Sequence, residues 1–85
     1  MKLKDTFITH MSNGEQILVD VSGEFSGLIR NNESAAFIVD CLKQETTVEE
    51  IADKMYEEYD APREVLGKAV NDVVSSLRKA GAVDE

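Results

Sequence analysis

Residues 6–21 read TFITHMSNGEQILVDV, and this stretch decides the fold of the N-terminal part of the chain. β-Branched and aromatic side chains are frequent on both sides of the central Ser12-Asn13-Gly14 segment. Asn and Gly tolerate the positive φ angles that a tight hairpin turn requires. The stretch therefore predicts two antiparallel strands, residues 6–10 and 16–21, joined by a turn at Ser12-Asn13-Gly14.

A third strand is predicted directly after this hairpin. Gly23 marks a second turn, and residues 25–30 (FSGLIR) follow it as a short strand with one charge, Arg30, and no proline. An antiparallel meander is the simplest sheet that the three segments form. If the third strand lies at the margin of this sheet, its free edge either accepts an extended peptide or is covered by the N-terminus or a second copy of the chain.

The rest of the chain follows the helical period. Asn32 or Ser34 caps a first helix that runs to about Leu42. Thr47 and Glu50 form a capping box that opens a second helix. The expected apolar faces of these helices are Ala35, Ile38, Cys41 and Leu42 on the first, and Val48, Ile51, Ala52, Met55 and Tyr59 on the second.

Pro62 suits the first turn of a third helix, and Gly81 is its expected C-terminal stop. Its apolar stripe is Leu66, Ala69, Val70, Val73, Leu77 and Ala80. With Val65 and Val74 the apolar arc covers about half of the helix circumference, more than a surface helix needs. The arc is either a three-sided core contact or a core contact with one edge left open to solvent.

The order of the predicted elements is three strands followed by three helices, which defines an α+β fold. The chain has 85 residues, enough for one domain over residues 1–85. Its net charge of −8 comes from 17 acidic and nine basic side chains, so the summed field repels DNA and anionic membrane surfaces. The acidic side chains are concentrated in residues 44–60, which makes the last helix the least acidic part of the molecule.

The sequence also bears on the compartment. One cysteine forms no internal disulfide, so nothing indicates an oxidising environment. Residues 1–5 (MKLKD) have no apolar run behind them, unlike a signal peptide. The longest apolar stretch, residues 35–39, is far too short to span a membrane. We therefore expect a cytoplasmic protein.

No arrangement of residues predicts catalysis. His10 and Cys41 are the only histidine and cysteine, they fall in different predicted elements, and no third metal ligand accompanies them. We expect His10 to be exposed and Cys41 to be a small core residue. Apart from Gly67 inside the predicted last helix, the glycines punctuate turns, and they form no phosphate-binding loop. The sequence thus predicts a protein without enzymatic activity, bound metal or cofactor.

Three motifs resemble a known family. Residues 25–38 (FSGLIRNNESAAFI) are similar to the strand–helix junction F-x-G-x-I-x-L-N-E-T-G-A-x-I of PqqD-like proteins, the pyrroloquinoline quinone biosynthesis protein D family, also called RiPP recognition elements. Residues 46–52 (TTVEEIA) with 56–60 (YEEYD), and residues 73–81 (VVSSLRKAG), resemble its second-helix and C-terminal motifs. Two departures are Asn31, where the family usually has leucine, and Ala69-Val70, where it commonly has Asp-Val.

The resemblance implies a winged-helix-like domain that captures the leader of a ribosomally made precursor peptide. In the family the leader adds as a strand to the third strand and packs against the third helix. The domain then presents the precursor to a modifying enzyme, often a radical SAM maturase. These are the elements with the free edge and the wide apolar arc. The alternative is a small winged-helix DNA-binding or transcription-associated domain, for which the last helix has few basic residues.

The two edges of the third-helix arc differ in composition. One carries Arg63, Gly67, Val70, Val74 and Arg78, and the other carries Val65, Lys68, Asp72 and Lys79. We favour the first edge, because Gly67 would permit close approach of a peptide backbone and the valines would anchor an apolar side chain. An acidic leader side chain would meet Arg63 or Arg30. The candidate peptide-binding residues are therefore Leu28, Ile29 and Arg30 on the strand, and Arg63, Gly67, Val70 and Val74 on the helix.

Overall fold

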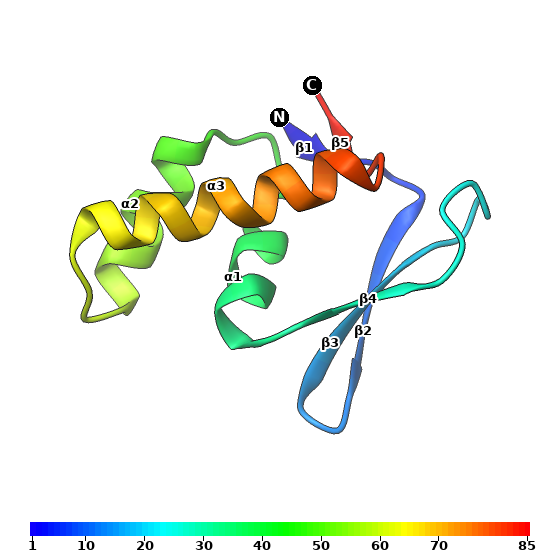
Figure 1. The fold of residues 1–85 in the computed structure, drawn as a ribbon, viewed down its shortest axis with the longest axis horizontal. Coiled ribbons are helices and arrows are strands. Elements are labelled where there is room, and N and C mark those ends of the chain that lie inside the picture. Colours follow the sequence, from blue (N-terminus) through cyan, green and yellow to red (C-terminus); the bar gives the residue numbers. More distant parts are fainter.

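The antiparallel meander forms in the computed structural model, which describes all of residues 1–85 (Figure 1). Strand β2 (Phe7–Ser12) pairs with β3 (Glu15–Asp20), and β3 pairs with β4 (Leu28–Asn31) in the order β2-β3-β4. Asn13 and Gly14 connect the first two strands with φ angles of 52° and 78°. The sheet, its antiparallel pairing and its first turn are therefore as the sequence predicted.

The third strand of this sheet begins later than predicted, at Leu28 instead of Phe25. The side chain of Asp20 accepts hydrogen bonds from the backbone N–H groups of Ser22 and Phe25, each at 3.0 Å, and this holds residues 20–25 in a turn. The ring of Phe25 then lies 6.2 Å from that of Phe7. A carboxylate that binds the backbone in this way competes with strand pairing, which sequence alternation does not reveal.

The three helices are α1 (Glu33–Cys41), α2 (Val48–Glu58) and α3 (Arg63–Lys79). Asn32, rather than Ser34, caps α1 and accepts from the N–H of Ala35 at 2.9 Å. Thr47 accepts from the N–H of Glu50 at 3.1 Å, so Thr47 is confirmed as the N-cap. The Glu50 carboxylate accepts from the Thr47 hydroxyl and not from the Thr47 backbone N–H, so only the Thr47 half of the predicted capping box forms.

One pair of strands was not predicted. Strand β1 (Lys2–Leu3) pairs antiparallel with β5 (Val83–Asp84), so the first and last residues lie side by side (Figure 1). The element order is therefore four strands, three helices and a fifth strand. Two residues are too few to show an alternating pattern, and only the packing of the chain brings these segments together.

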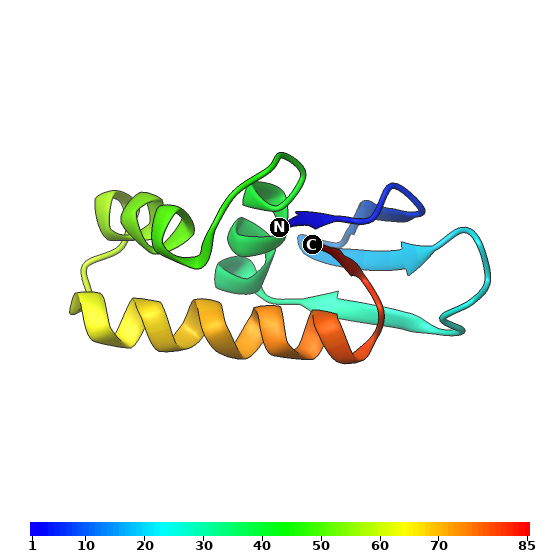
Figure 2. The same cartoon turned by 90° about the horizontal axis from the view of Figure 1, so that it is seen from above.

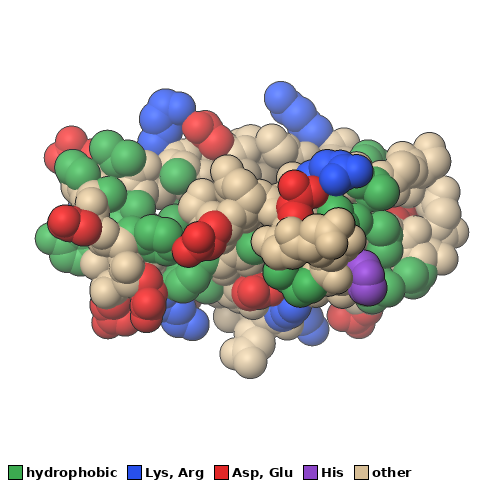
Figure 3. All heavy atoms as spheres, turned by 90° about the horizontal axis from the view of Figure 1, so that it is seen from below, with side chains coloured by type: hydrophobic (Ala, Val, Ile, Leu, Met, Phe, Trp, Pro, Cys, Tyr) green, Lys and Arg blue, Asp and Glu red, His purple; other side chains and the backbone are tan.

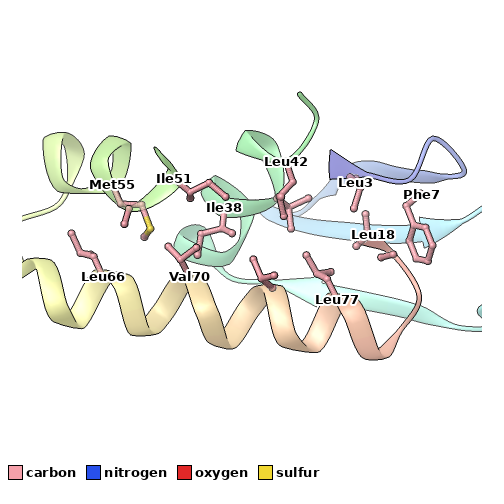
Figure 4. Packing of buried hydrophobic residues seen from close by; sticks show 14 residues of the cluster. Leu3, Phe7, Leu18, Ile38, Leu42, Ile51, Met55, Leu66, Val70 and Leu77 are labelled. Carbon is pink, nitrogen blue, oxygen red and sulfur yellow. The ribbon is translucent and has the colours of Figure 1, made fainter. Parts of the chain in front are cut away.

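The core lies between the sheet and the helices (Figure 4). In Figure 2 helix α3 runs along one side of the molecule, with α2 packed over its N-terminal part, α1 over its middle and β4 next to its C-terminal part. Leu18 of β3, Ile38 of α1, Ile51 of α2 and Val70 of α3 are all fully buried. None of the helices is long and apolar enough to cross a membrane.

Candidate functional site

A groove of about 540 Å³ lies between β4 and the C-terminal half of α3. β4 is paired with β3 on one side only, so it ends the sheet (Figure 2). The groove is mostly apolar, and its lining residues are Phe25, Ile29, Arg30, Asn31, Ala35, Asp72, Val73, Ser76, Leu77, Lys79 and Ala80. An unpaired strand beside an apolar groove can hold an extended peptide by its backbone and by its side chains.

Strand alternation separates the three predicted residues of β4. Ile29 stands opposite the buried Leu18, so its side chain lies on the helix-facing side of the sheet and lines the groove. Leu28 stands opposite Val19 on the other face and is 49% exposed. The Arg30 guanidinium pairs with Glu15 at 2.9 Å, although this residue still borders the groove.

The prediction that Val70 and Val74 lie on an open edge of α3 is wrong. Val70 and Val74 are fully buried, and Figure 4 shows Val70 pointing from α3 toward Ile38 of α1. The apolar arc of α3 is wider than a surface stripe, but sequence does not reveal which of its edges α1 and α2 cover. They cover the edge that the sequence analysis had assigned to the peptide.

The two other candidate residues of that edge, Arg63 and Gly67, lie away from the groove as well. Arg63, at the start of α3, pairs with Asp53 and reaches the carbonyl oxygen of Glu49, so α2 holds it. At Gly67 an added Cβ would meet no atom within 4 Å, so no backbone of this chain approaches closely there. The close approach expected at Gly67 is therefore not made within the chain.

The edge of α3 that lines the groove is the opposite one. Val73, Ser76 and Ala80 recur at helical spacing along it, with Asp72 and Lys79 at its border. Small and apolar residues three and four positions apart were visible in the sequence. The arginines and the glycine of the other edge made it the better candidate in the sequence.

Ion pairs leave one cation free at the groove. Asp72 accepts from Lys68 at 2.8 Å, and this hydrogen bond raises the pKa of Lys68 above its usual value. Arg78 is turned to Glu85, with the shorter contact at 2.7 Å. Lys79 lines the groove and pairs with no carboxylate of the chain. A peptide carboxylate lying near Lys79 would therefore find an uncompensated positive charge.

The residues considered for catalysis stay apart. His10 is exposed and pairs across the sheet with Ile17, while Cys41 is only partly buried on α1. Burial raises the pKa of the Cys41 thiol, which disfavours the nucleophilic thiolate. No group of three or more His, Cys, Asp and Glu side chains is arranged to hold a metal ion.

Comparison with known proteins gives one family and two similar structures. The family model described as coenzyme PQQ synthesis protein D (PqqD) matches residues 15–83. A structure of TbiB1 in complex with the TbiA(beta) leader peptide superposes with a TM-score of 0.84 at 19% identity, covering 99% of this chain and 95% of that one. Lasso peptide synthetase B1 complexed with the leader peptide superposes at 0.81 with 20% identity, covering 99% and 96%. No curated protein matches the chain.

Proposed function

The chain belongs to the family of coenzyme PQQ synthesis protein D, and from this premise we propose that it is a non-catalytic adaptor for a precursor peptide. It captures the leader segment of a ribosomally made precursor and presents the attached core to a modifying enzyme, such as a radical SAM maturase. The fold supports this proposal, because both similar structures are complexes with a leader peptide. The covalent chemistry belongs to the partner enzyme.

The observation that carries the proposal is the apolar groove beside the unpaired edge of β4. The leader lies in the groove as an added strand, and its backbone hydrogen-bonds to the free edge of residues 28–31. Its side chains alternate in direction, so every second one enters the groove. Backbone pairing supplies affinity for any extended segment, and the inward side chains supply selectivity.

The inward side chains meet a strip formed by Ile29 on β4 and by Val73 and Ala80 on α3. An aliphatic leader residue anchors there, because burial of its apolar surface stabilises the complex. An acidic leader residue lies toward Lys79, the unpaired cation of the groove. Compared with the residues chosen from sequence, Ile29 is retained and the valine contact moves from Val70 and Val74 to Val73.

DNA binding fits the surface less well. The net charge of the chain is −8. Of the basic side chains of α3, Arg63, Lys68 and Arg78 are each paired with a carboxylate. Neutralised cations release few phosphate counterions, so they add little to nucleic-acid affinity. The proposed partners are therefore a leader peptide and its modifying enzyme, with no nucleic acid and no membrane.

The test begins with the selection of a peptide on the full chain from a displayed random library. The selected peptide is then titrated into ¹⁵N-labelled protein. Amide shifts are expected to concentrate in Leu28–Asn31 and in residues 72–80 of α3. Shifts confined to the acidic helix α2, or spread evenly over the chain, would contradict strand addition at β4.

A further inference from the structure

Two buried amides lie side by side at the end of β4. Asn31 is 5% exposed and Gln16 is 3% exposed, and they are direct partners in the register of β3 and β4. The Asn31 Nδ2 donates to Gln16 Oε1 at 2.8 Å, and Gln16 Nε2 donates to Asp40 Oδ1 at 3.0 Å. Asp40 is held in turn by Lys43 at 3.0 Å, so the chain of contacts starts at a fixed carboxylate.

Chemistry alone sets the direction of both amides. The paired carboxylate of Asp40 only accepts hydrogen bonds, so Gln16 must turn its NH₂ group toward it and its oxygen toward Asn31. That oxygen also only accepts, so Asn31 must present its own NH₂ group. An exchange of the oxygen and nitrogen positions in either amide would place two acceptors or two donors face to face.

This orientation leaves the oxygen of Asn31 free. Asn31 Oδ1 accepts no hydrogen bond within the chain, and no buried side-chain polar atom lacks a partner, so Oδ1 is accessible from outside. Its nitrogen points across the sheet to Gln16 of β3, and the oxygen of a planar amide diverges from the nitrogen, so Oδ1 is turned away from the Gln16 amide. Asn31 lines the groove, on the same face of the strand as Ile29.

We propose that Asn31 determines peptide specificity: its Oδ1 accepts a hydrogen bond from a neutral donor side chain, a hydroxyl or a carboxamide, of the bound peptide. This inference rests on the proposed function and adds one polar residue that selects a peptide side chain to an otherwise apolar strip. The donor lies one inward position away from the residue that packs on Ile29. It is neutral because Lys79 already supplies an uncompensated positive charge to the same groove.

A peptide with an aliphatic side chain at this position leaves the oxygen of Asn31 buried without a donor, which costs free energy. A peptide with Ser, Thr, Asn or Gln there satisfies it. Replacing that residue by alanine in a bound peptide is expected to weaken binding roughly three- to ten-fold, the size of one neutral hydrogen bond.

The experiment compares peptide selection on the wild-type chain and on Asn31→Leu, from one displayed library of random peptides long enough to pair with β4. The wild type is expected to enrich Ser, Thr, Asn or Gln at one position of the selected peptides. Asn31→Leu is expected to enrich Leu, Ile, Val or Met at that same position. Replacing that peptide residue by alanine is then expected to change the affinity for Asn31→Leu by less than about two-fold, because the variant has no hydrogen bond there to lose.

Two further variants separate specificity from stability. Asn31→Leu leaves the oxygen of Gln16 unpaired in the interior, so the double variant Gln16→Met/Asn31→Leu removes both amides together. It is expected to melt closer to the wild type and to select the same aliphatic residues. Gln16→Met alone keeps Asn31 but releases its amide to rotate, and the preference for donors is expected to weaken.

The outcomes are distinct. If the wild type and the folded leucine variants select the same residues at every position, Asn31 does not read the peptide, while peptide capture itself stands. If the wild type enriches Lys or Arg at that position, the neutral class of donor is wrong. If neither protein enriches any peptide over immobilised carrier alone, the proposed function fails and this inference fails with it.

Discussion

Helix α3 has two apolar edges that look alike in sequence, but one is buried in the core and the other lines the groove. Val70 and Val74 point into the core and are fully buried, whereas Val73 lies on the groove beside β4 with Ser76 and Ala80. The difference comes from the neighbours of the helix, because α1 and α2 cover the first edge, whereas the second edge is only partly buried and faces the groove. A rotation of about one residue around this helix therefore separates a valine that packs in the core from a valine that lines the groove.

The largest expected effect is the loss of stability when a valine of the buried edge is shortened. Val70→Ala removes two buried methyl groups and leaves a cavity, so the free energy of unfolding is expected to fall by about 2–3 kcal/mol. Denaturant titration measures this loss. Val73→Ala is the matched control on the groove edge, where a loss below about 1 kcal/mol is expected because the side chain is only partly buried.

A loss at Val73 as large as that at Val70 would show that the groove edge is also core. In that case the division of α3 into two edges would be wrong.

On the groove side, Val73→Asp is expected to weaken peptide binding by more than ten-fold while the protein stays folded. The new carboxylate would lie in the apolar strip, where a bound peptide excludes water from it, and burial of an unpaired charge costs free energy. Calorimetry with a peptide selected on the wild type measures the change. Val65→Asp serves as the control, since Val65 is 57% exposed on the same helix and does not line the groove.

Equal effects of the two aspartates would indicate that added charge, and not the place of Val73, weakens binding. Unchanged affinity in Val73→Asp would contradict peptide binding in this groove.

The turn before β4 is expected to make the stability of the protein depend on pH, because it is held by the carboxylate of Asp20. The side-chain hydrogen bond from Ser22, supported by the N–H groups of Phe25 and Ser22, lowers the pKa of Asp20 from 3.8 to about 2. A lowered pKa in the folded state means that the carboxylate stabilises the fold above the pH at which the unfolded chain titrates, near 4, and that this contribution is lost as the pH falls toward 2.

Asp20→Ala is therefore expected to melt several degrees lower than the wild type at pH 7, and the gap should narrow between pH 4 and pH 2. Thermal melting followed by circular dichroism gives both values. Asp5→Ala is the control, an exposed aspartate outside this turn. A gap that stays constant down to pH 2 would mean that the carboxylate charge of Asp20 does not stabilise the turn.

The smallest expected effect is at the border of the groove. Lys79→Ala is expected to reduce affinity for a peptide with an acidic residue only about two- to three-fold, and to flatten the dependence of binding on salt. Lys54→Ala is the control, because Lys54 is an exposed lysine of α2 that does not line the groove and forms no ion pair with a groove residue. Binding measured at low and high salt distinguishes them, and an identical salt dependence in both variants would remove Lys79 from the site.

Much of the fold could be predicted from residues that lie close together in the sequence. The turn at Asn13-Gly14, the Asn32 cap (one of the two predicted candidates) and the Thr47 cap are formed by residues that contact one another within a few positions. Their geometry follows from backbone freedom and from the short reach of a polar side chain. The family resemblance of the three motifs is confirmed by the match over residues 15–83.

The sequence by itself thus determined the order of the main strands and helices, the Thr47 cap and the family. The tertiary structure decided the rest: the pairing of β1 with β5, the turn that delays β4, and the edge of α3 that faces the groove. The strand pairing and the covered edge depend on contacts between residues far apart in the chain, whereas the turn is held by local hydrogen bonds to Asp20 that strand alternation does not reveal. Periodicity shows that a helix has an apolar arc, but only the packing of α1 and α2 against α3 decides which part of that arc stays open.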